Sequence, residues 1–549
     1  MAVTADSYVA TEERRRGISF LIVVSCLIFL AVACAGPAGG ATSTPPASTL
    51  RTEVRPSRIN HRAVTPTDTL RAAAGAEPDD ARQATASPEV NFTASPQLSP
   101  TSEAPAEWRA DVRLYETSIT LSSYPYESYL RERIDPRYNF RVAWLDRAAY
   151  DAASPEPQPR VFKAVVLENR YLRLTFLPEL GGRLYMCTFK PTQQDIFYRN
   201  SVLKPSSWGP LNREENWWLA AGGMEWALPV HEHGYEWGVP WMYQMEWKEN
   251  AASITLRDSA ADNRLRAEIT VTLPSERAFF VVQPRLVNPT SEAITCQFWI
   301  NAVLTLGSAS ACANTEFIYP TERMIVHSTG ESGLPSERRM MAWPVHGGRD
   351  WSLYRNWRNW LGVFVPDAQE EYVGAYNHDT ELGLVRVFPP EEAPGLKLFA
   401  FGSDFPARGE YSDDGSDYFE MWAGPCRTFW PEDDVSIGPG QSLAWSETWL
   451  PFVRVDGIDR AGTEAVARAD VRDGRVRLGV AVSCVRSLEV CLQWNDQTFH
   501  EQREGASPGF PLLIDVPLPS GADPPGQLRV QLRSENGAIL LEYRKSVPL

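Results

Sequence analysis

Aromatic, acidic and imidazole side chains are concentrated between Trp208 and Trp247. This stretch holds seven tryptophans, the run Gly222-Gly-Met-Glu225 and the triplet His231-Glu-His233. Tryptophan faces stack on the C–H faces of sugar rings, whereas carboxylates and imidazoles bind hydroxyls or transfer protons. The mixture predicts a carbohydrate site. A large aromatic core is the alternative for each tryptophan, because a buried ring removes a large apolar area from water.

The histidine pair raises the question of a metal. His231 and His233 would share one face of an extended strand, since side chains repeat every two residues, and Glu225 and Glu236 are nearby carboxylates. A metal site needs a third placed ligand, which the spacing does not supply. We therefore predict sugar hydrogen bonding at this pair, with no metal and no cofactor.

The N-terminus predicts export. Arg14 to Arg16 precede an apolar run from Ile18 to Ala33, and small residues lead to Cys34. This pattern predicts a signal peptide over residues 1–34 that resembles the lipobox of bacterial lipoproteins, with Cys34 as the lipidated residue. An uncleaved membrane anchor is the alternative, because the run nearly reaches the ~20 residues that span a bilayer. Both place the remaining chain at the cell membrane, on its extracytoplasmic face.

The remaining chain divides by composition. Residues 35–106 are rich in Pro, Ser, Thr and Ala, which predicts a disordered tether. Residues 107–452 predict a large β domain, and residues 456–549 a small β-sandwich. The formal net charge is −16, so nucleic acid is excluded as a partner, because phosphate binding needs a basic face.

From residue 112 onward the sequence predicts an all-β protein. Short alternating or apolar runs are separated by turn signals such as Asn288-Pro-Thr290, and no long stretch has the 3.6-residue period of a helix. This pattern favours sandwiches over an α/β fold. Three runs in the C-terminal part, at 476–482, 488–494 and 528–532, predict a small immunoglobulin-like sandwich.

Several motifs resemble those of a known superfamily. They are Leu174-Thr-Phe-Leu-Pro-Glu-Leu-Gly-Gly-Arg183, Asp195-Ile-Phe-Tyr-Arg-Asn200, Gly222-Gly-Met-Glu-Trp226 and Tyr418-Phe-Glu-Met-Trp-Ala-Gly424. Their order and spacing resemble galactose-mutarotase-like (aldose 1-epimerase-like) β-supersandwich domains, most closely the DUF5107 type. The resemblance covers residues 107–452 and implies a supersandwich fold.

The resemblance also implies roles for single residues. In mutarotases a glutamate takes a proton from the anomeric hydroxyl and a histidine donates one to the ring oxygen. Glu420 falls where the base would lie, and His233 resembles the histidine that orients the substrate. Ala302 occupies the position where a second histidine is expected, so His231 or His378 would have to supply the acid.

Two functions follow from these expectations. The first is a membrane-anchored carbohydrate-binding protein with a mutarotase-like cleft, which the missing histidine favours. The alternative is a carbohydrate-active enzyme, epimerase-like or glycan-cleaving, with a Glu base and a His acid. The predicted catalytic residues are Glu420, His233 and His231. The predicted substrate-binding residues are Glu225, Trp226, Trp237, Trp241, Trp217, Arg183, His378 and Trp422.

A second aromatic segment, Arg349 to Trp360, alternates tryptophan with arginine and asparagine. It could form one wall of a sugar cleft, with rings for stacking and polar side chains for hydroxyls. The alternative is a surface turn held by cation–π contacts.

Overall fold

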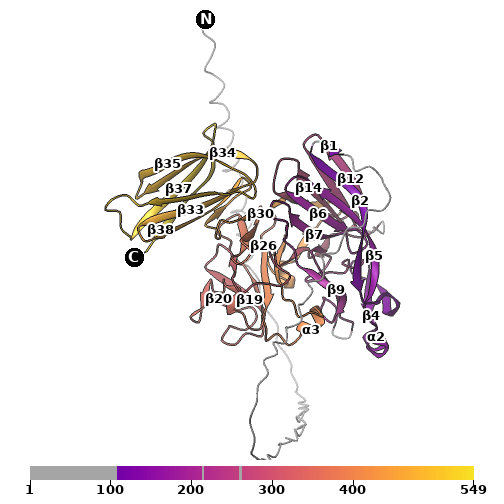
Figure 1. The fold of residues 1–549 in the computed structure, drawn as a ribbon. Coiled ribbons are helices and arrows are strands. Elements are labelled where there is room, and N and C mark those ends of the chain that lie inside the picture. Colours follow the sequence, from indigo (N-terminus) through magenta and orange to yellow (C-terminus); the bar gives the residue numbers. More distant parts are fainter. Residues whose placement is uncertain (1–107, 110, 213–214, 259–262, 549) are drawn as a thin grey trace, which may run out of the picture. The chain divides into compact units, whose positions relative to one another are not determined.

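The computed structural model describes residues 108–109, 111–212, 215–258 and 263–548 (Figure 1). Cys34, the predicted signal peptide and the predicted tether lie outside the described residues. Strands dominate the described chain, and helices are few and short, so the all-β prediction is confirmed. No helix in the described part is long and apolar enough to cross a membrane.

The larger of two extended sheets carries the candidate site. Within the described residues it holds fifteen strands, and β1 (Trp108–Arg109) and β8 (Gln194–Asp195) pair beside its main path. In order across the sheet, the other strands are β10 (Trp218–Gly222), β9 (Arg199–Ser206), β2 (Val112–Ser123), β5 (Gln158–Glu168), β6 (Leu172–Leu177), β7 (Arg183–Phe189), β11 (Met224–Ala227), β17 (Trp299–Leu304), β27 (Phe419–Gly424), β26 (Gly395–Phe401), β23 (Trp360–Phe364), β19 (Arg323–Thr329) and β20 (Met340–Ala342).

A second, nine-stranded sheet packs against the first. Its order is β12 (Met242–Lys248), β13 (Ala251–Arg257), β14 (Arg266–Pro274), β15 (Phe280–Val287), β30 (Glu447–Val453), β25 (Leu382–Val387), β24 (Tyr372–Asn377) and β18 (Thr315–Ile318), and β29 (Ser442–Ala444) pairs with β15. The main hydrophobic core joins residues of both sheets, for example Leu398 of β26 and Val271 of β14. The two sheets therefore form a sandwich.

Short elements flank this sandwich. They are the hairpins β3 (Leu130–Asp135) with β4 (Phe140–Leu145) and β21 (Val345–His346) with β22 (Arg349–Asp350), the pair β16 (Ile294–Cys296) with β28 (Val435–Ile437), the helices α2 (Arg147–Ala153) and α3 (Arg408–Tyr411), and the single 3₁₀ turns 127–129, 354–356 and 431–433. Of these, α3 contributes its Tyr411 to the site described below.

The C-terminal part has a core of its own. One four-stranded sheet contains β31 (Arg460–Ala461), β32 (Ala465–Arg472), β33 (Arg475–Val482) and β36 (Leu512–Pro517). The other contains β35 (Gln497–Ala506), β34 (Arg486–Trp494), β37 (Gly526–Ser534) and β38 (Ile539–Val547). Alternate residues of these strands, such as Val490 and Val530, meet in a separate hydrophobic cluster.

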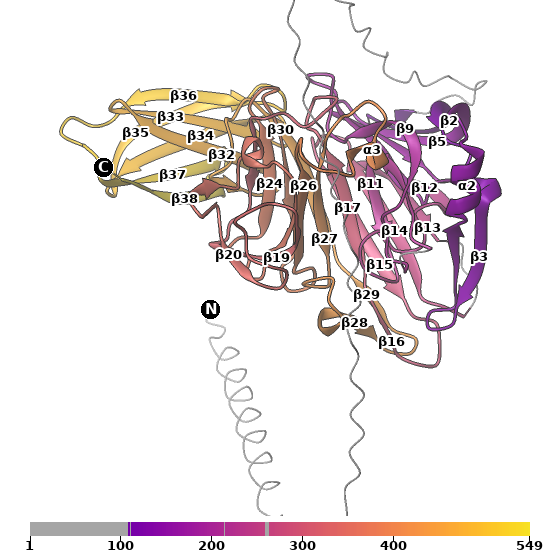
Figure 2. The same ribbon diagram turned by 90° about the horizontal axis from the view of Figure 1, so that it is seen from below.

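Alternation along the central strands separates core from site. In β26, Leu396 and Leu398 face the core, and in β27 Phe419 and Met421 do the same. Because neighbouring side chains point to opposite faces, Lys397, Phe399, Glu420 and Trp422 project from the other face of the sheet, where they line one cavity. Figure 2 shows β17, β27 and β26 running side by side.

We expect Trp226→Ala to destabilise the fold strongly. The Trp226 side chain lies in the main core, and its indole N–H donates to the Gly182 carbonyl at 3.1 Å. Loss of such a side chain costs about 3–5 kcal/mol of unfolding free energy, measurable by chemical denaturation. Trp208→Ala is the matched control, because Trp208 is 42% exposed and its loss should cost at most about 0.5 kcal/mol. Equal effects of the two substitutions would contradict this description of the core.

Candidate functional site

A cavity of about 300 Å³ opens on the face of the larger sheet that is turned away from the core, and we call it the sheet-face cleft. Its volume lies at the lower end of the range typical of small-molecule sites. Its walls come from β19, β23, β26, β27, α3 and four loops. The lining residues are Trp208, Glu232, His233, His327, Ser328, Glu337, Trp360, Lys397, Phe399, Phe405, Tyr411, Glu420 and Trp422.

Strand register places the polar residues in a row. Glu225 of β11 pairs with Asn301 of β17, Asn301 pairs with Trp422 of β27, and Trp422 pairs with Lys397 of β26. Side chains opposite one another on paired strands project from the same face of the sheet. The row therefore connects the base of the cleft to the buried carboxylate beside it.

Glu225 is a buried carboxylate that positions His233. Its Oε2 accepts from Arg183 Nη2 at 2.7 Å and Trp218 Nε1 at 3.1 Å, and its Oε1 accepts from Asn301 Nδ2 at 3.1 Å. The remaining bond, at 2.6 Å, is with His233 Nδ1. Because a carboxylate only accepts, Nδ1 carries the proton and Nε2 is the free ring nitrogen.

The ionised form of Glu225 is stabilised by its partners. Burial alone would raise the pKa of this carboxyl, but Arg183 and His233 outweigh burial and lower it to about 2. The His233 ring also stacks on Trp218, with the ring centroids 4.0 Å apart. Glu225 and Arg183, both predicted to touch substrate, do not line the cleft; they fix the imidazole that does.

The turn at Gly222 and Gly223 lets β11 place Glu225. Both glycines have a positive φ, +85° and +76°. A Cβ on Gly222 would lie 2.2 Å from the Tyr198 carbonyl oxygen, so only glycine fits this approach. The Gly-Gly motif therefore has a structural cause.

Glu420, the residue predicted as a base, lines the sheet-face cleft. Its Oε2 accepts from the Trp422 indole N–H at 2.8 Å, and the carboxyl is almost fully buried. Burial raises its pKa, although His233 and Lys397 act in the opposite direction. A carboxyl with a raised pKa exchanges protons closer to neutral pH, as a general base or acid must.

Lys397 is the main residue that the sequence reasoning missed. Its side chain is buried on the cleft wall, and its Nζ lies over the Trp422 and Phe429 rings, 4.5 and 4.4 Å from their centroids. Burial lowers its pKa to about 8, although Glu420 and Glu232 act to raise it. One feature of the sequence could have identified it. Lys397 is the single lysine in the apolar strand 396–401, and a lysine is rarely buried unless it is paired.

His327 also lines the cleft without having been predicted. Its ring lies 5.2 Å from Phe364 and 5.1 Å from Phe429, centroid to centroid, and its Nδ1 is buried with no hydrogen-bond partner among the described residues. Burial, reinforced by Lys397, lowers its pKa well below the usual value. This imidazole is therefore neutral at physiological pH.

Of the predicted histidines, His233 lines the cleft, whereas His231 and His378 do not. His231 and His233 form part of a turn and not the extended strand that we expected, because Glu232 between them has a φ of +53°. The two side chains therefore do not share a strand face. His231 lies beside Phe429, and His378 hydrogen-bonds Asp456 and Glu316.

Ala302 faces the main core and not the cleft, so a histidine in its place would not line the site. The cleft nevertheless contains a second imidazole. It belongs to His327 of β19, and not to a residue of β17.

Most of the predicted tryptophans are buried structure. Trp226 and Trp241 belong to the main core, and Trp217 and Trp237 pack edge to face in a second core cluster, with ring centroids 4.2 Å apart. None of the four lines the sheet-face cleft, whereas Trp422 does. Their burial agrees with the aromatic-core alternative.

The segment from Arg349 to Trp360 contributes one ring to the cleft. Trp360 lines it, together with the exposed Trp208. Trp351 and Trp357 are buried in the main core, and the Arg349 guanidinium lies 4.8 Å from the centroid of the Trp351 ring. The segment thus contributes Trp360 to the cleft wall and Trp351 and Trp357 to the main core.

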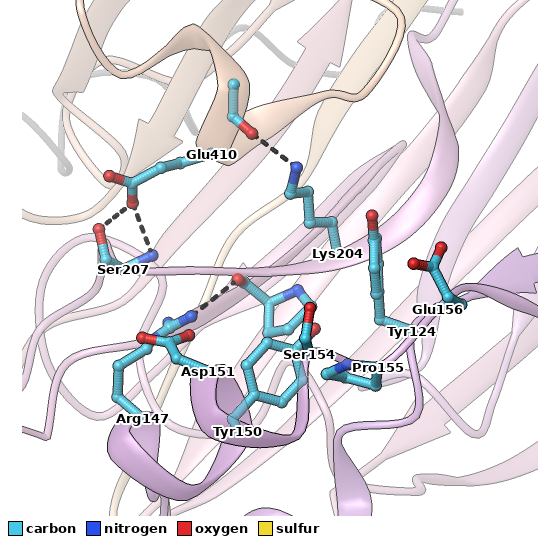
Figure 3. Close-up of a pocket in the computed structure, with 12 residues that line it drawn as sticks. Tyr124, Arg147, Tyr150, Asp151, Ser154, Pro155, Glu156, Lys204, Ser207 and Glu410 are labelled. Atoms are coloured by element: carbon cyan, nitrogen blue, oxygen red, sulfur yellow. Dashed lines mark hydrogen bonds between the residues drawn. The ribbon is translucent and has the colours of Figure 1, made fainter.

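A second cavity differs in character. The groove in Figure 3 is larger, about 570 Å³, and lies between α2, β9 and the start of α3. Three of its charged side chains bind protein groups: Glu410 accepts from the Ser207 N–H, Lys204 donates to the Gly409 carbonyl at 2.6 Å, and Arg147 donates to the Ser206 carbonyl at 2.9 Å. These three groups therefore have less free hydrogen-bonding capacity for a ligand than the polar groups of the sheet-face cleft.

No set of three or more His, Cys, Asp or Glu side chains within the described residues is arranged to hold a metal ion.

Comparison with known families places the chain. The family described as "Domain of unknown function (DUF5107)" matches residues 143–452, more than half of the chain. The chain belongs to the DUF5107 family. The predicted resemblance is thereby confirmed. In this DUF5107 protein, residues 460–543 also match a family described as "YphG-like protein, second domain".

Solved structures resemble this DUF5107 protein at low sequence identity. A TPR-domain containing protein from Parabacteroides distasonis shares 18% identity, with a TM-score of 0.52 over 65% of this chain and 57% of that one, so this chain spans little more than half of that relative. This similarity shows a shared fold.

Galactose mutarotase-like and aldose epimerase-like proteins are also among the matches. A galactose mutarotase-like protein from Clostridium acetobutylicum has 10% identity and a TM-score of 0.37 over 53% of this chain and 96% of that one. A putative aldose 1-epimerase from Escherichia coli K12 has 13% identity and a TM-score of 0.36 over 53% and 98%.

We expect Glu225→Gln to destabilise the protein and to change its response to acid. The folded-state pKa of about 2 lies below the unfolded value, so the stabilisation by this carboxylate is complete above about pH 4.5 and is lost as the pH falls toward 2. Removing its charge leaves Arg183 buried without a counter-ion, at a cost of about 3–5 kcal/mol.

Urea denaturation of wild type and variant between pH 2 and 7 measures both effects. The variant should be less stable at pH 7 and should lose less stability on acidification. Glu246→Gln, at an exposed carboxylate, is the control and should resemble wild type. A Glu225→Gln protein as stable as this control at pH 7 would contradict the assigned role.

Proposed function

We propose that this chain binds a small carbohydrate in the sheet-face cleft. The observation that carries the proposal is the composition of that one cavity, in which the Trp208, Trp360 and Trp422 rings lie with the carboxyl of Glu420 and two imidazoles. Aromatic rings provide flat apolar surfaces for the C–H faces of a sugar, and the polar groups bind its hydroxyls. The volume suits a ligand the size of a small sugar.

Free hydrogen-bonding capacity supports the proposal. Glu420 uses its Oε2 to accept from Trp422, and its Oε1 has no partner among the described residues. His233 uses Nδ1 for Glu225, which leaves Nε2 free. A sugar hydroxyl both donates and accepts, so it complements a carboxylate oxygen and an imidazole nitrogen at once.

A second candidate function is interconversion of sugar anomers. Glu420 and His233 line the same cavity, and the acid–base alternative requires that both reach one sugar. Burial raises the pKa of Glu420, which suits it to accept a proton from the anomeric hydroxyl. His233, held in one orientation by Glu225, would donate from Nε2 to the ring oxygen in its imidazolium form, and would take up a proton again when the ring recloses. His231 does not line the cleft, so His233 is the better acid.

We expect Glu420→Gln to weaken sugar binding by about tenfold or more, because it replaces a charge-assisted hydrogen bond with a neutral one. Proton NMR of a panel of monosaccharides, with saturation transfer from the protein, measures binding and anomer exchange in the same tube. Glu410→Gln, in the second groove, is the matched control and should behave as wild type. Saturation transfer that is absent in wild type, or equal in both variants, would contradict a carbohydrate site at Glu420.

The same spectra separate the two candidate functions. Anomer exchange that wild type accelerates and Glu420→Gln does not would establish the enzyme. Binding without acceleration would leave the carbohydrate-binding protein.

We also propose that lipidation of Cys34 anchors this module at the extracytoplasmic face of the cell membrane. The support is the sequence alone: the arginines before the apolar run and the small residues that precede Cys34. On expression in a bacterial host, wild type should remain with the membrane fraction, and Cys34→Ser should be released into the soluble fraction. A Cys34→Ser protein that stays in the membrane after an alkaline wash would contradict the lipid anchor and favour the uncleaved transmembrane alternative.

A further inference from the structure

Lys397 is a buried residue whose ammonium has no ionic partner among the described residues. Its side chain is 3% exposed, and no described carboxylate lies within ion-pair distance of its Nζ, nor does any described group hydrogen-bond it. The nearest groups are aromatic faces, which replace only part of the lost hydration. Burying an unpaired charge is strongly unfavourable, so such a charge is usually paired.

The strand register explains why Glu420 does not pair with Lys397. Lys397 is directly opposite Trp422, whereas Glu420 is opposite Phe399, so the two charges are diagonal neighbours on β26 and β27. Glu420 Oε2 is also occupied by the Trp422 indole. The Trp422 ring thus lies with its face toward the Lys397 ammonium and its N–H edge bonded to Glu420, and all three residues line the cavity.

We propose that the sheet-face cleft selects an acidic sugar, whose carboxylate pairs with Lys397. This inference rests on the proposed carbohydrate function and names the class of sugar. A hydroxyl would satisfy one N–H of the ammonium without neutralising it, whereas a carboxylate supplies both the counter-charge and the acceptor oxygens. The sugar ring then lies against Trp208 and Trp360, toward the open side of the cleft.

The other charged groups around the cleft are compatible with an anionic ligand. Lys397 is the one cationic side chain among the described lining residues. Burial raises the pKa of Glu420 and lowers that of His327, so His327 adds no charge to the cleft. Glu337 is exposed, and Glu232 lies in the turn at the rim.

Calorimetric titration of the full chain with D-galacturonate, D-galactose and D-galactose 6-sulfate tests the proposal. Wild type should bind galacturonate at least about tenfold more tightly than galactose, a typical effect of one charge-assisted contact. The sulfate distinguishes a requirement for a planar carboxylate from a general preference for anions. Equal affinity for galacturonate and galactose would overturn the proposal, and stronger binding of the sulfate would overturn the carboxylate assignment.

Variants assign the effect to one side chain. Lys397→Met keeps the length of the side chain and removes its charge, so it should lower affinity for galacturonate about tenfold to a hundredfold and change affinity for galactose less than about threefold. Lys397→Arg should retain the preference. Lys163→Met, at an exposed lysine outside the cleft, is the control for net charge. An equal loss for both sugars in Lys397→Met would show a structural role and overturn the inference.

The pH dependence gives a readout that packing would not change. Because the free ammonium has a pKa of about 8, affinity for galacturonate should fall as the pH rises above that value, in wild type and not in Lys397→Met. The titratable groups that face the same cavity are Glu232, His233, His327, Glu337, Tyr411 and Glu420. If galactose binds and galacturonate does not bind better, this inference fails alone; if neither binds, the proposed function fails with it.

Discussion

The buried Glu225 carboxylate is the interaction on which the site depends. It joins β7, β10, β11, β17 and the turn at His233 through four hydrogen bonds, two to each oxygen. A buried carboxylate is unfavourable unless its acceptor sites are filled and its charge is balanced, and Arg183 provides that balance. One anion therefore fixes the position of four strands and one imidazole. His233 is held in the cleft before any ligand arrives, which reduces the ordering cost of binding.

The two faces of the larger sheet are used differently. Toward the second sheet, alternate residues such as Leu398 and Met421 form a continuous apolar core. On the opposite face, the intervening residues Lys397, Glu420 and Trp422 form the cleft. Burial of ionisable groups on this face lowers the free energy of unfolding. The extensive apolar core offsets that loss. The same burial shifts the pKa values of Glu420 and Lys397 toward neutrality, and shifts of this kind are typical of functional sites.

The sequence was sufficient for the fold class and for part of the site. Period-2 patterning is local, so the all-β character was predictable, and the motifs around Glu420 and His233 identified two residues that line the cleft. Which tryptophans are exposed was not predictable, because burial depends on pairings between distant strands. Glu225 and Asn301, for example, are 76 residues apart and become neighbours only through the β11–β17 register. Lys397 was missed for the same reason: its strand was recognised, but not the face that becomes a cavity.

The central claim is that the sheet-face cleft, and not the larger groove beside α2, holds the ligand. A crystal structure of the protein soaked with D-galacturonate tests this claim most directly. We expect density for a sugar ring against Trp208 and Trp360, with its carboxylate at Lys397 Nζ and a hydroxyl at Glu420. Density in the groove of Tyr124, Lys204 and Glu410, with the sheet-face cleft lacking sugar, would contradict it.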